Sequence, residues 1–119
     1  ELPEKYKETG QPVIMPGSMG TSSYILAGKR DGKPSFYSTA HGAGRKMSRT
    51  AARKNISDKS LFDLMKKKGI ILKSRSKEGA TEEAPGAYKD INEIVDAVSS
   101  AGLAQKVAKV KPLAVIKGE

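Results

Sequence analysis

The residues best suited to chemistry in this sequence lie between Ser38 and Arg49. His41, the only histidine among the 119 residues, is followed by three small residues, Gly42 to Gly44, and then by cations. Little side-chain bulk therefore separates the imidazole from a ligand. A neutral imidazole nitrogen can attack phosphorus and carry a nucleotidyl group covalently when cations or a metal neutralise the leaving group. A lone histidine is more often structural or superficial, so both interpretations stay open on the residues alone.

The positive charge of the chain is concentrated around this stretch. Residues 29–77 hold 15 Lys or Arg against three acids, a net charge of +12, whereas the rest of the chain carries seven against ten, a net charge of −3. A concentrated positive field favours polyanions such as RNA, DNA, nucleotides or acidic lipid surfaces. The alternative is a solvated, lysine-rich surface of a heat-adapted protein.

Length and composition fit a single segment of one domain, residues 1–119, in which the polar residues 1–11 form a connector. The chain has no cysteine, and its acids and single histidine have no metal-ligand spacing, so it predicts neither a disulfide nor a metal site of its own. No stretch approaches the apolar length of a membrane span and no signal-peptide pattern opens the chain, which favours a cytoplasmic protein without a membrane partner. Glu1 in place of Met suggests a piece of something longer.

A loop rich in glycine and serine precedes the histidine. Pro12 to Met15 predicts a short strand cut off by Pro16-Gly17, and the loop continues from Gly17 to Ser23. Its glycines allow successive backbone amides to point into a concavity that holds an anion, and hydroxyls line it. No Gly-Lys-Ser/Thr closes the loop, so it is not a Walker sequence, and a plain hairpin turn is the alternative.

The elements that must position these loops follow from residue propensity and spacing. Two β-prone stretches, 24–27 and 35–40, predict a β-hairpin whose second strand leads directly into His41. Arginines recur every fourth residue, which predicts one cationic face of a helix beginning near the glycines: Arg45, Arg49 and Arg53. The free amides at its N-terminus favour an anion, although an ordinary exposed cationic helix has the same pattern.

The rest of the chain predicts mostly structural elements. In order these are a helix over 58–68, a strand over 70–73, a polar loop over 74–79, a helix between Asp90 and Gly102, and strand-like alternation over 103–117 that Pro112 bends. The last helix carries an apolar stripe at i, i+3, i+4 and i+7, which marks a core face: Ile91, Ile94, Val95 and Val98. The fold class is therefore α+β, with mixed strands and about three helices.

Four separate motifs stand in a fixed order along the chain. They are Pro16-Gly17-Ser18-Met19-Gly20-Thr21; His41-Gly42-Ala43-Gly44-Arg45 with Met47-Ser48-Arg49; Glu82-Glu83-Ala84-Pro85 with Ala87-Tyr88-Lys89-Asp90; and Ile116-Lys117-Gly118. In order and spacing they resemble the C-terminal portion of RtcB, the family of GTP-dependent RNA-splicing ligases, over nearly the entire chain. The resemblance implies a C-terminal segment of the RtcB-type fold, incomplete without its N-terminal part.

The resemblance implies a three-step joining of RNA ends. In that family the histidine of the His-Gly-Ala-Gly motif attacks the α-phosphate of GTP and becomes guanylylated. The guanylate passes to an RNA 3′-phosphate, itself made from a 2′,3′-cyclic phosphate, and the 5′-hydroxyl of the other end displaces GMP. By position His41 is that nucleophile, and Arg45 and Arg49 would meet RNA phosphates. The implied GTP pocket comprises Pro16, Gly17, Ser18, Met19, Ser23, His41, Gly42, Ala43, Gly44, Tyr88 and Lys117.

The resemblance also implies partners that this chain does not contain. The manganese ligands of the family, a Cys with Asp and His residues, lie in its larger N-terminal part, so we expect GTP and manganese as cofactors and no ligation by this segment alone. RNA ends such as tRNA halves and the N-terminal part of the same protein are the expected partners; whether a helper protein assists turnover stays open. The residues by themselves also allow a different function, a noncatalytic basic RNA-binding module.

Overall fold

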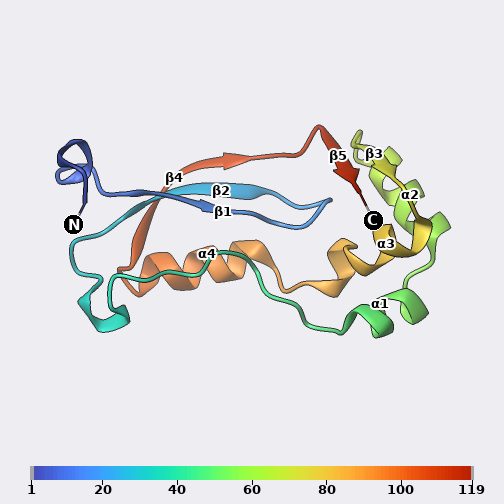
Figure 1. Ribbon diagram of the computed structural model, residues 1–119, viewed down its shortest axis with the longest axis horizontal. Coiled ribbons are helices and arrows are strands. Elements are labelled where there is room, and N and C mark those ends of the chain that lie inside the picture. Colours follow the sequence, from blue (N-terminus) through green and yellow to red (C-terminus); the bar gives the residue numbers. More distant parts are fainter. Residues whose placement is uncertain (1, 119) are drawn as a thin grey trace.

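The chain forms an elongated body, 47 × 25 × 22 Å, with an antiparallel sheet over one helix at one end and a cluster of short helices at the other (Figure 1). The computed structural model describes residues 2–118, so Glu1 and Glu119 lie outside it. The elements, with η for a 3-10 helix, are η1 (Glu4–Tyr6), β1 (Pro12–Met15), β2 (Ser23–Gly28), η2 (Lys33–Ser35), α1 (Arg49–Asn55), α2 (Asp58–Lys67), β3 (Ile71–Ser74), α3 (Lys77–Glu82), η3 (Pro85–Ala87), α4 (Ile91–Ser100), β4 (Ala104–Val110) and β5 (Ala114–Lys117).

The three-stranded sheet has the order β1-β2-β4, and both pairs are antiparallel. Strands β1 and β2 form a hairpin in which Met15 lies opposite Tyr24. Because side chains alternate along a strand, Met15, Tyr24 and Leu26 share one face. That face packs on α4, whose core residues Ile91 and Val95 are fully buried. The first hydrophobic core therefore lies between the sheet and α4.

Local signals explain the limits of α4. The Asp90 carboxylate accepts a hydrogen bond from the Asn92 amide at 2.8 Å and so caps the helix N-terminus. Gly102, two residues beyond the helix, adopts the left-handed conformation that commonly ends a helix (φ +73°). The predicted helix between these residues is confirmed.

A second core lies among α2, α3 and the parallel pair β3–β5. Met19, from the loop after β1, is buried there beside Leu61 and Met65 of α2. The loop between β1 and β2 therefore reaches from the sheet into the helical cluster and connects the two cores.

The structure corrects the predicted hairpin over 24–27 and 35–40. Strand β2 pairs with β1 and β4, so both of its edges are occupied and residues 35–40 form no strand. They follow η2, and Phe36 and Tyr37 adopt left-handed backbone angles (φ 54° and 57°) with largely exposed rings. His41 is therefore reached through an irregular segment and not at the end of a strand.

Other predicted limits shift because of local capping. The predicted polar loop over 74–79 contains the start of α3, whose N-terminus is capped by the Ser76 hydroxyl. The cationic helix begins only at Arg49, capped by Ser48, so Arg45 stands before it. Residues 103–117 divide at Pro112 into β4 and β5, which belong to different sheets. The mixed α+β class is confirmed; the described residues contain four α-helices because α3 is added to the predicted ones.

Candidate functional site

The loop between β1 and β2 is braced by its own side chains. The Gly17 amide donates to Ser23 Oγ at 3.1 Å, and the Ser18 amide donates to Thr21 Oγ1 at 2.7 Å. A Cβ at Gly17 would stand 2.1 Å from the Ser22 carbonyl oxygen, so the tight turn has room only for glycine. Two of the backbone amides of the loop that was predicted to hold an anion are thus hydrogen-bonded inside the loop.

The segment with the histidine lies against this loop. A Cβ at Gly42 would stand 3.9 Å from the Pro16 carbonyl oxygen, which places the two predicted motifs side by side. Ala43 is buried in the core beneath the sheet, next to Met15. His41 itself is exposed, and none of the described residues hydrogen-bonds its imidazole. One buried alanine therefore anchors a short segment whose histidine stays accessible.

A short antiparallel bridge joins the histidine segment to Tyr88, three residues before α4. Arg45 and Tyr88 are paired, with the Lys46 amide donating to the Ala87 carbonyl at 2.9 Å and the Lys89 amide to the Gly44 carbonyl at 3.0 Å. These backbone bonds bring Tyr88, 47 residues after His41, into the neighbourhood of the histidine motif.

The Arg45 side chain turns inward and secures this bridge. Its guanidinium donates hydrogen bonds to the Met47 carbonyl at 3.0 Å, the Tyr88 hydroxyl at 3.0 Å and the Glu82 carbonyl at 2.6 Å. It also lies over the Tyr88 ring, 4.8 Å from the centroid. Most of its donor capacity is therefore used within the protein. The predicted contact between Arg45 and RNA stays a prediction.

Glu83 gathers two of the predicted pocket residues around one carboxylate. It accepts hydrogen bonds from the Tyr88 hydroxyl at 3.0 Å and from Lys117 Nζ at 3.3 Å. Partial burial raises the pKa of the Glu83 carboxyl, but the bond from Tyr88 and the charges of Lys117 and Arg45 outweigh burial, so its pKa lies below the ordinary value. Burial and the adjacent carboxylate raise the pKa of the Tyr88 phenol. The group is therefore an ionised carboxylate with a neutral phenol and two cations.

The neighbouring Glu82 forms ion pairs with the other two arginines of the predicted row, Arg49 and Arg53. Arg53 Nε lies 3.1 Å from its carboxylate and Arg49 Nε 3.7 Å. Both arginines are more exposed than Arg45, with 69% of the Arg49 side chain accessible. Sequence reasoning assigned no role to Glu82 or Glu83. Both acids stand in the third of the four motifs, Glu82-Glu83-Ala84-Pro85, and that motif was the available signal for them.

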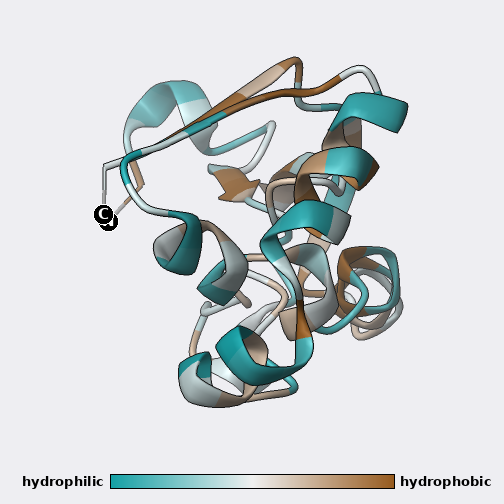
Figure 2. Cartoon of the chain, turned by 90° about the vertical axis from the view of Figure 1, so that its right-hand side faces the viewer, coloured by the Kyte–Doolittle hydropathy of each residue, from teal (hydrophilic) through white to brown (hydrophobic). Residues whose placement is uncertain are grey.

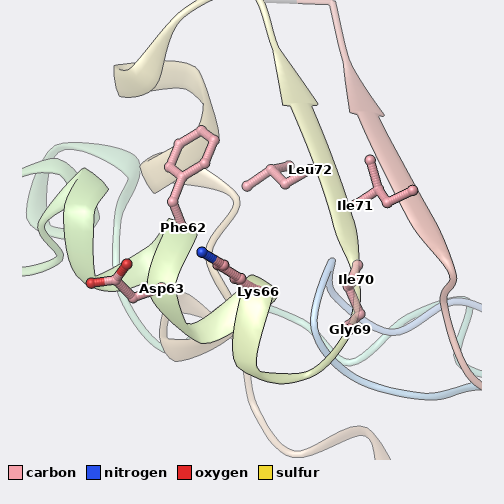
Figure 3. A pocket seen from close by; sticks show the side chains of 7 residues that line it. All are labelled: Phe62, Asp63, Lys66, Gly69, Ile70, Ile71 and Leu72. Atoms are coloured by element: carbon pink, nitrogen blue, oxygen red, sulfur yellow. The ribbon is translucent and has the colours of Figure 1, made fainter.

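A hollow in the surface lies away from these residues. About 480 Å³ in volume, it opens between α2 and the start of β3 and is lined mainly by apolar residues, among them Phe62 and Leu72 (Figure 3). None of the predicted site residues lines it.

Within residues 2–118 no three His, Cys, Asp or Glu side chains gather as a metal site would need, and no helix is long and apolar enough to cross a membrane.

The family model for tRNA-splicing ligase RtcB matches residues 1–118 of this chain. The chain belongs to the RtcB family. It is 53% identical over 118 residues to RNA-splicing ligase RtcB homolog 2 of Entamoeba dispar, 48% identical over 118 residues to RNA-splicing ligase RtcB of Mycobacterium bovis, and 50% identical over 119 residues to tRNA-splicing ligase RtcB of Nanoarchaeum equitans. These matches cover 98–99% of this chain but 22%, 27% and 25% of the relatives. The chain thus spans about a quarter of their length.

The structure brings the four motifs shared with RtcB into contact. Pro16 lies beside Gly42, Gly44 is hydrogen-bonded to Lys89, and Tyr88 and Lys117 meet at Glu83. Met19 is the exception among the predicted pocket residues, because its side chain is buried in the helical cluster. The roles of the individual site residues in nucleotide and RNA binding stay predictions.

Proposed function

We propose that this chain is the part of an RtcB-type RNA ligase that carries the nucleophile, His41. The complete protein would join an RNA 2′,3′-cyclic phosphate or 3′-phosphate end to a 5′-hydroxyl end, as in tRNA splicing and RNA repair. The single observation that carries the proposal is an exposed, unbonded imidazole on a segment anchored by Ala43, inside a motif of the family to which the chain belongs.

The surroundings of His41 suit a covalent nucleotide intermediate. A neutral imidazole nitrogen would attack the α-phosphorus of GTP and form an N–P bond, while the bond to the pyrophosphate oxygen breaks and pyrophosphate leaves with the electron pair. The guanylate would then pass to the RNA 3′-phosphate, and the 5′-hydroxyl would displace GMP. The small residues Gly42 and Gly44 leave room for a triphosphate beside the ring.

The nucleotide pocket would be formed by the two neighbouring loops together with Tyr88 and Lys117, which both donate to Glu83. The first loop would contribute Pro16, Gly17, Ser18, Met19 and Ser23, and the histidine segment Gly42, Ala43 and Gly44. Met19 can act only through its backbone because its side chain is buried. Tyr88 supplies a ring for stacking and Lys117 a cation for polar contact.

RNA phosphates would bind Arg45 and Arg49 of the predicted arginine row. Arg49 is the better placed of the two predicted contacts, because its side chain is largely exposed and its one ion pair, with Glu82, spans 3.7 Å. Arg45 has fewer free donors, since three hydrogen bonds already engage its guanidinium. The net +12 of residues 29–77 supports a polyanionic substrate.

The activity would require parts that these residues do not supply. Residues 2–118 hold no group of three side chains that could ligate a metal. Manganese would be held by the remaining part of the protein. The outer face of the β1-β2-β4 sheet also supports the proposal that further parts of the protein pack on this chain. Ile14, Ile25 and Ala108 stand in register across its three strands, with Ile14 72% exposed. In Figure 2 hydrophobic residues occur on strand segments as well as on the helices. Apolar residues on both faces are typical of strands covered on both sides.

The competing function is a noncatalytic RNA-binding module, which the same positive charge would also support. Incubating the complete protein with labelled GTP and manganese separates the two. We expect an acid-labile guanylate adduct on His41, and the variant His41→Ala, checked for folding by circular dichroism, should form no adduct and ligate no RNA. Ligation by that variant would refute the proposal. A salt-sensitive RNA affinity that is indifferent to GTP and to His41 would establish the module.

A further inference from the structure

Glu83 is the point where three separate segments of the chain meet. The Tyr88 hydroxyl donates to it from the segment before α4, Lys117 Nζ from the end of β5, and Arg45 Nη1 lies 3.7 Å away on the histidine segment. About a quarter to a third of each charged side chain is exposed, namely 31% of Glu83, 33% of Lys117 and 26% of Arg45. Charges that are partly shielded from water interact more strongly than charges on an open surface.

These contacts determine which groups remain free for a ligand. The Tyr88 oxygen accepts from Arg45 and donates to Glu83, so the hydroxyl is fully engaged. Arg45 covers one face of the ring, which leaves at most the opposite face for stacking. An ammonium has three N–H donors, and Glu83 takes one from Lys117, so two remain. The group thus offers one ring face and two donors.

A flat base with acceptors on its edge fits that combination. Guanine presents the acceptors N7 and O6 on one edge, whereas adenine presents an amino donor in place of O6. A fixed ammonium therefore favours guanine. A lysine side chain is flexible, however, and holding it in one geometry costs conformational entropy that a partner must offset. Glu83 is the partner of Lys117 among the described residues.

We propose that Glu83 is a positioning residue for base recognition: it holds the Tyr88 ring and the Lys117 ammonium in one geometry that selects guanine over adenine. The inference rests on the proposed function, because it takes Tyr88 and Lys117 as walls of the GTP pocket. Glu83 does not touch the nucleotide and acts through these two residues.

The test uses the complete protein with the substitution Glu83→Gln, which keeps the size and removes the charge. The measured quantity is the rate of guanylate adduct formation as a function of GTP, with ATP as a competitive inhibitor. We expect the apparent KM for GTP to rise about tenfold and the limiting rate to stay within about twofold, because only the binding of the base is lost. The inhibition constant of ATP should not change, so the preference for GTP falls by the same factor.

Three further variants separate positioning from a general structural effect. Glu93→Gln makes the same change at an exposed position of α4 and should leave the KM for GTP unchanged. Glu83→Asp keeps the charge with a shorter reach, so its KM should lie between those of the wild type and Glu83→Gln. Adding Tyr88→Phe to Glu83→Gln should raise KM by less than the product of the single effects, because both act in one network.

The outcomes are distinct. No adduct in the wild type refutes the proposed function, and the inference with it. A normal wild-type adduct together with an unchanged KM in Glu83→Gln and Glu83→Asp overturns the inference alone, as does a lower limiting rate without a change in KM. If Glu83→Gln does not fold, Glu83→Asp decides by itself: a KM for GTP above the wild-type value supports the positioning role, and a wild-type KM overturns it.

Discussion

Replacing Arg45 with methionine is expected to loosen the bridge between the histidine segment and Tyr88. Methionine retains the apolar length of the side chain and removes the guanidinium. The change therefore deletes the three hydrogen bonds to Met47, Glu82 and Tyr88 and the contact with the Tyr88 ring. The pairing of the two segments would then be held by its backbone hydrogen bonds alone.

The structure sets the size of the effect. Each hydrogen bond from the half-buried guanidinium contributes about 1 kcal/mol net, and the contact with the ring adds about 0.5–1 kcal/mol. Releasing the long side chain returns about 1.5–2 kcal/mol of conformational entropy. The local stability of the bridge should fall by about 2 kcal/mol, which corresponds to an opening equilibrium about 30 times more favourable.

Hydrogen exchange of the Lys46 and Lys89 amides reports this opening directly, because both donate across the bridge. In Arg45→Met of the complete protein both should exchange about 30 times faster. Arg49→Met is the matched control. Its exposed side chain loses one 3.7 Å ion pair, so exchange at the same amides should change by no more than about twofold.

Equal exchange rates in the two variants would refute this reasoning. They would mean that the Arg45 guanidinium does not hold the bridge in solution and is as free as that of Arg49 to bind RNA. Faster exchange in Arg45→Met alone would show that Arg45 and Arg49 have different roles, although both belong to the same row of arginines in the sequence.

Two further predictions concern Glu83 and the outer face of the sheet. The Glu83 pKa is below its ordinary 4.5, so its stabilising effect is full above that pH and is lost as the pH falls through the lowered value. The protection factor of the Lys89 amide should therefore fall as the pH is lowered below 4.5 in the wild type and not in Glu83→Gln, and a parallel fall in both would contradict the assignment. Ile14→Ala in the complete protein should lower the free energy of unfolding by about 2–4 kcal/mol in urea titration, as for a buried position, although Ile14 is 72% exposed here. A loss below about 0.5 kcal/mol would mean that the face stays open to solvent.

Elements with local determinants were predictable from the sequence. Helix α4 has a capping Asp90, an apolar stripe and a terminating Gly102 within 13 residues, so nothing outside the segment was needed. Residues 35–40 have strand propensity too, but a strand also needs a free neighbour. β2 has none, since β1 and β4 occupy its two edges. The second edge of β2 is occupied by β4, residues 104–110. No local sequence pattern near Phe36 indicates this pairing.

The same distinction holds for the site. The histidine motif and its small residues are contiguous and were recognisable. The even spacing of the arginines predicted one helical face, yet Arg45 stands before the helix and contacts Glu82 and Tyr88, more than 35 residues away. Glu83 was missed because its partners come from positions 45, 88 and 117, and a convergence of that kind has no signature in sequence spacing.

The placement of His41 relative to the Glu83 group depends on two different anchors. Ala43 fixes the histidine segment on the core beneath the sheet, whereas Lys117 belongs to β5, which packs with the helical cluster. Arg45 connects them, since it is two residues from Ala43 and contacts Tyr88 directly. A nucleotide that reaches from the proposed base site at Tyr88 to the imidazole would therefore span the junction of the two cores. Its alignment for attack would depend on the bridge at Arg45 as much as on either core.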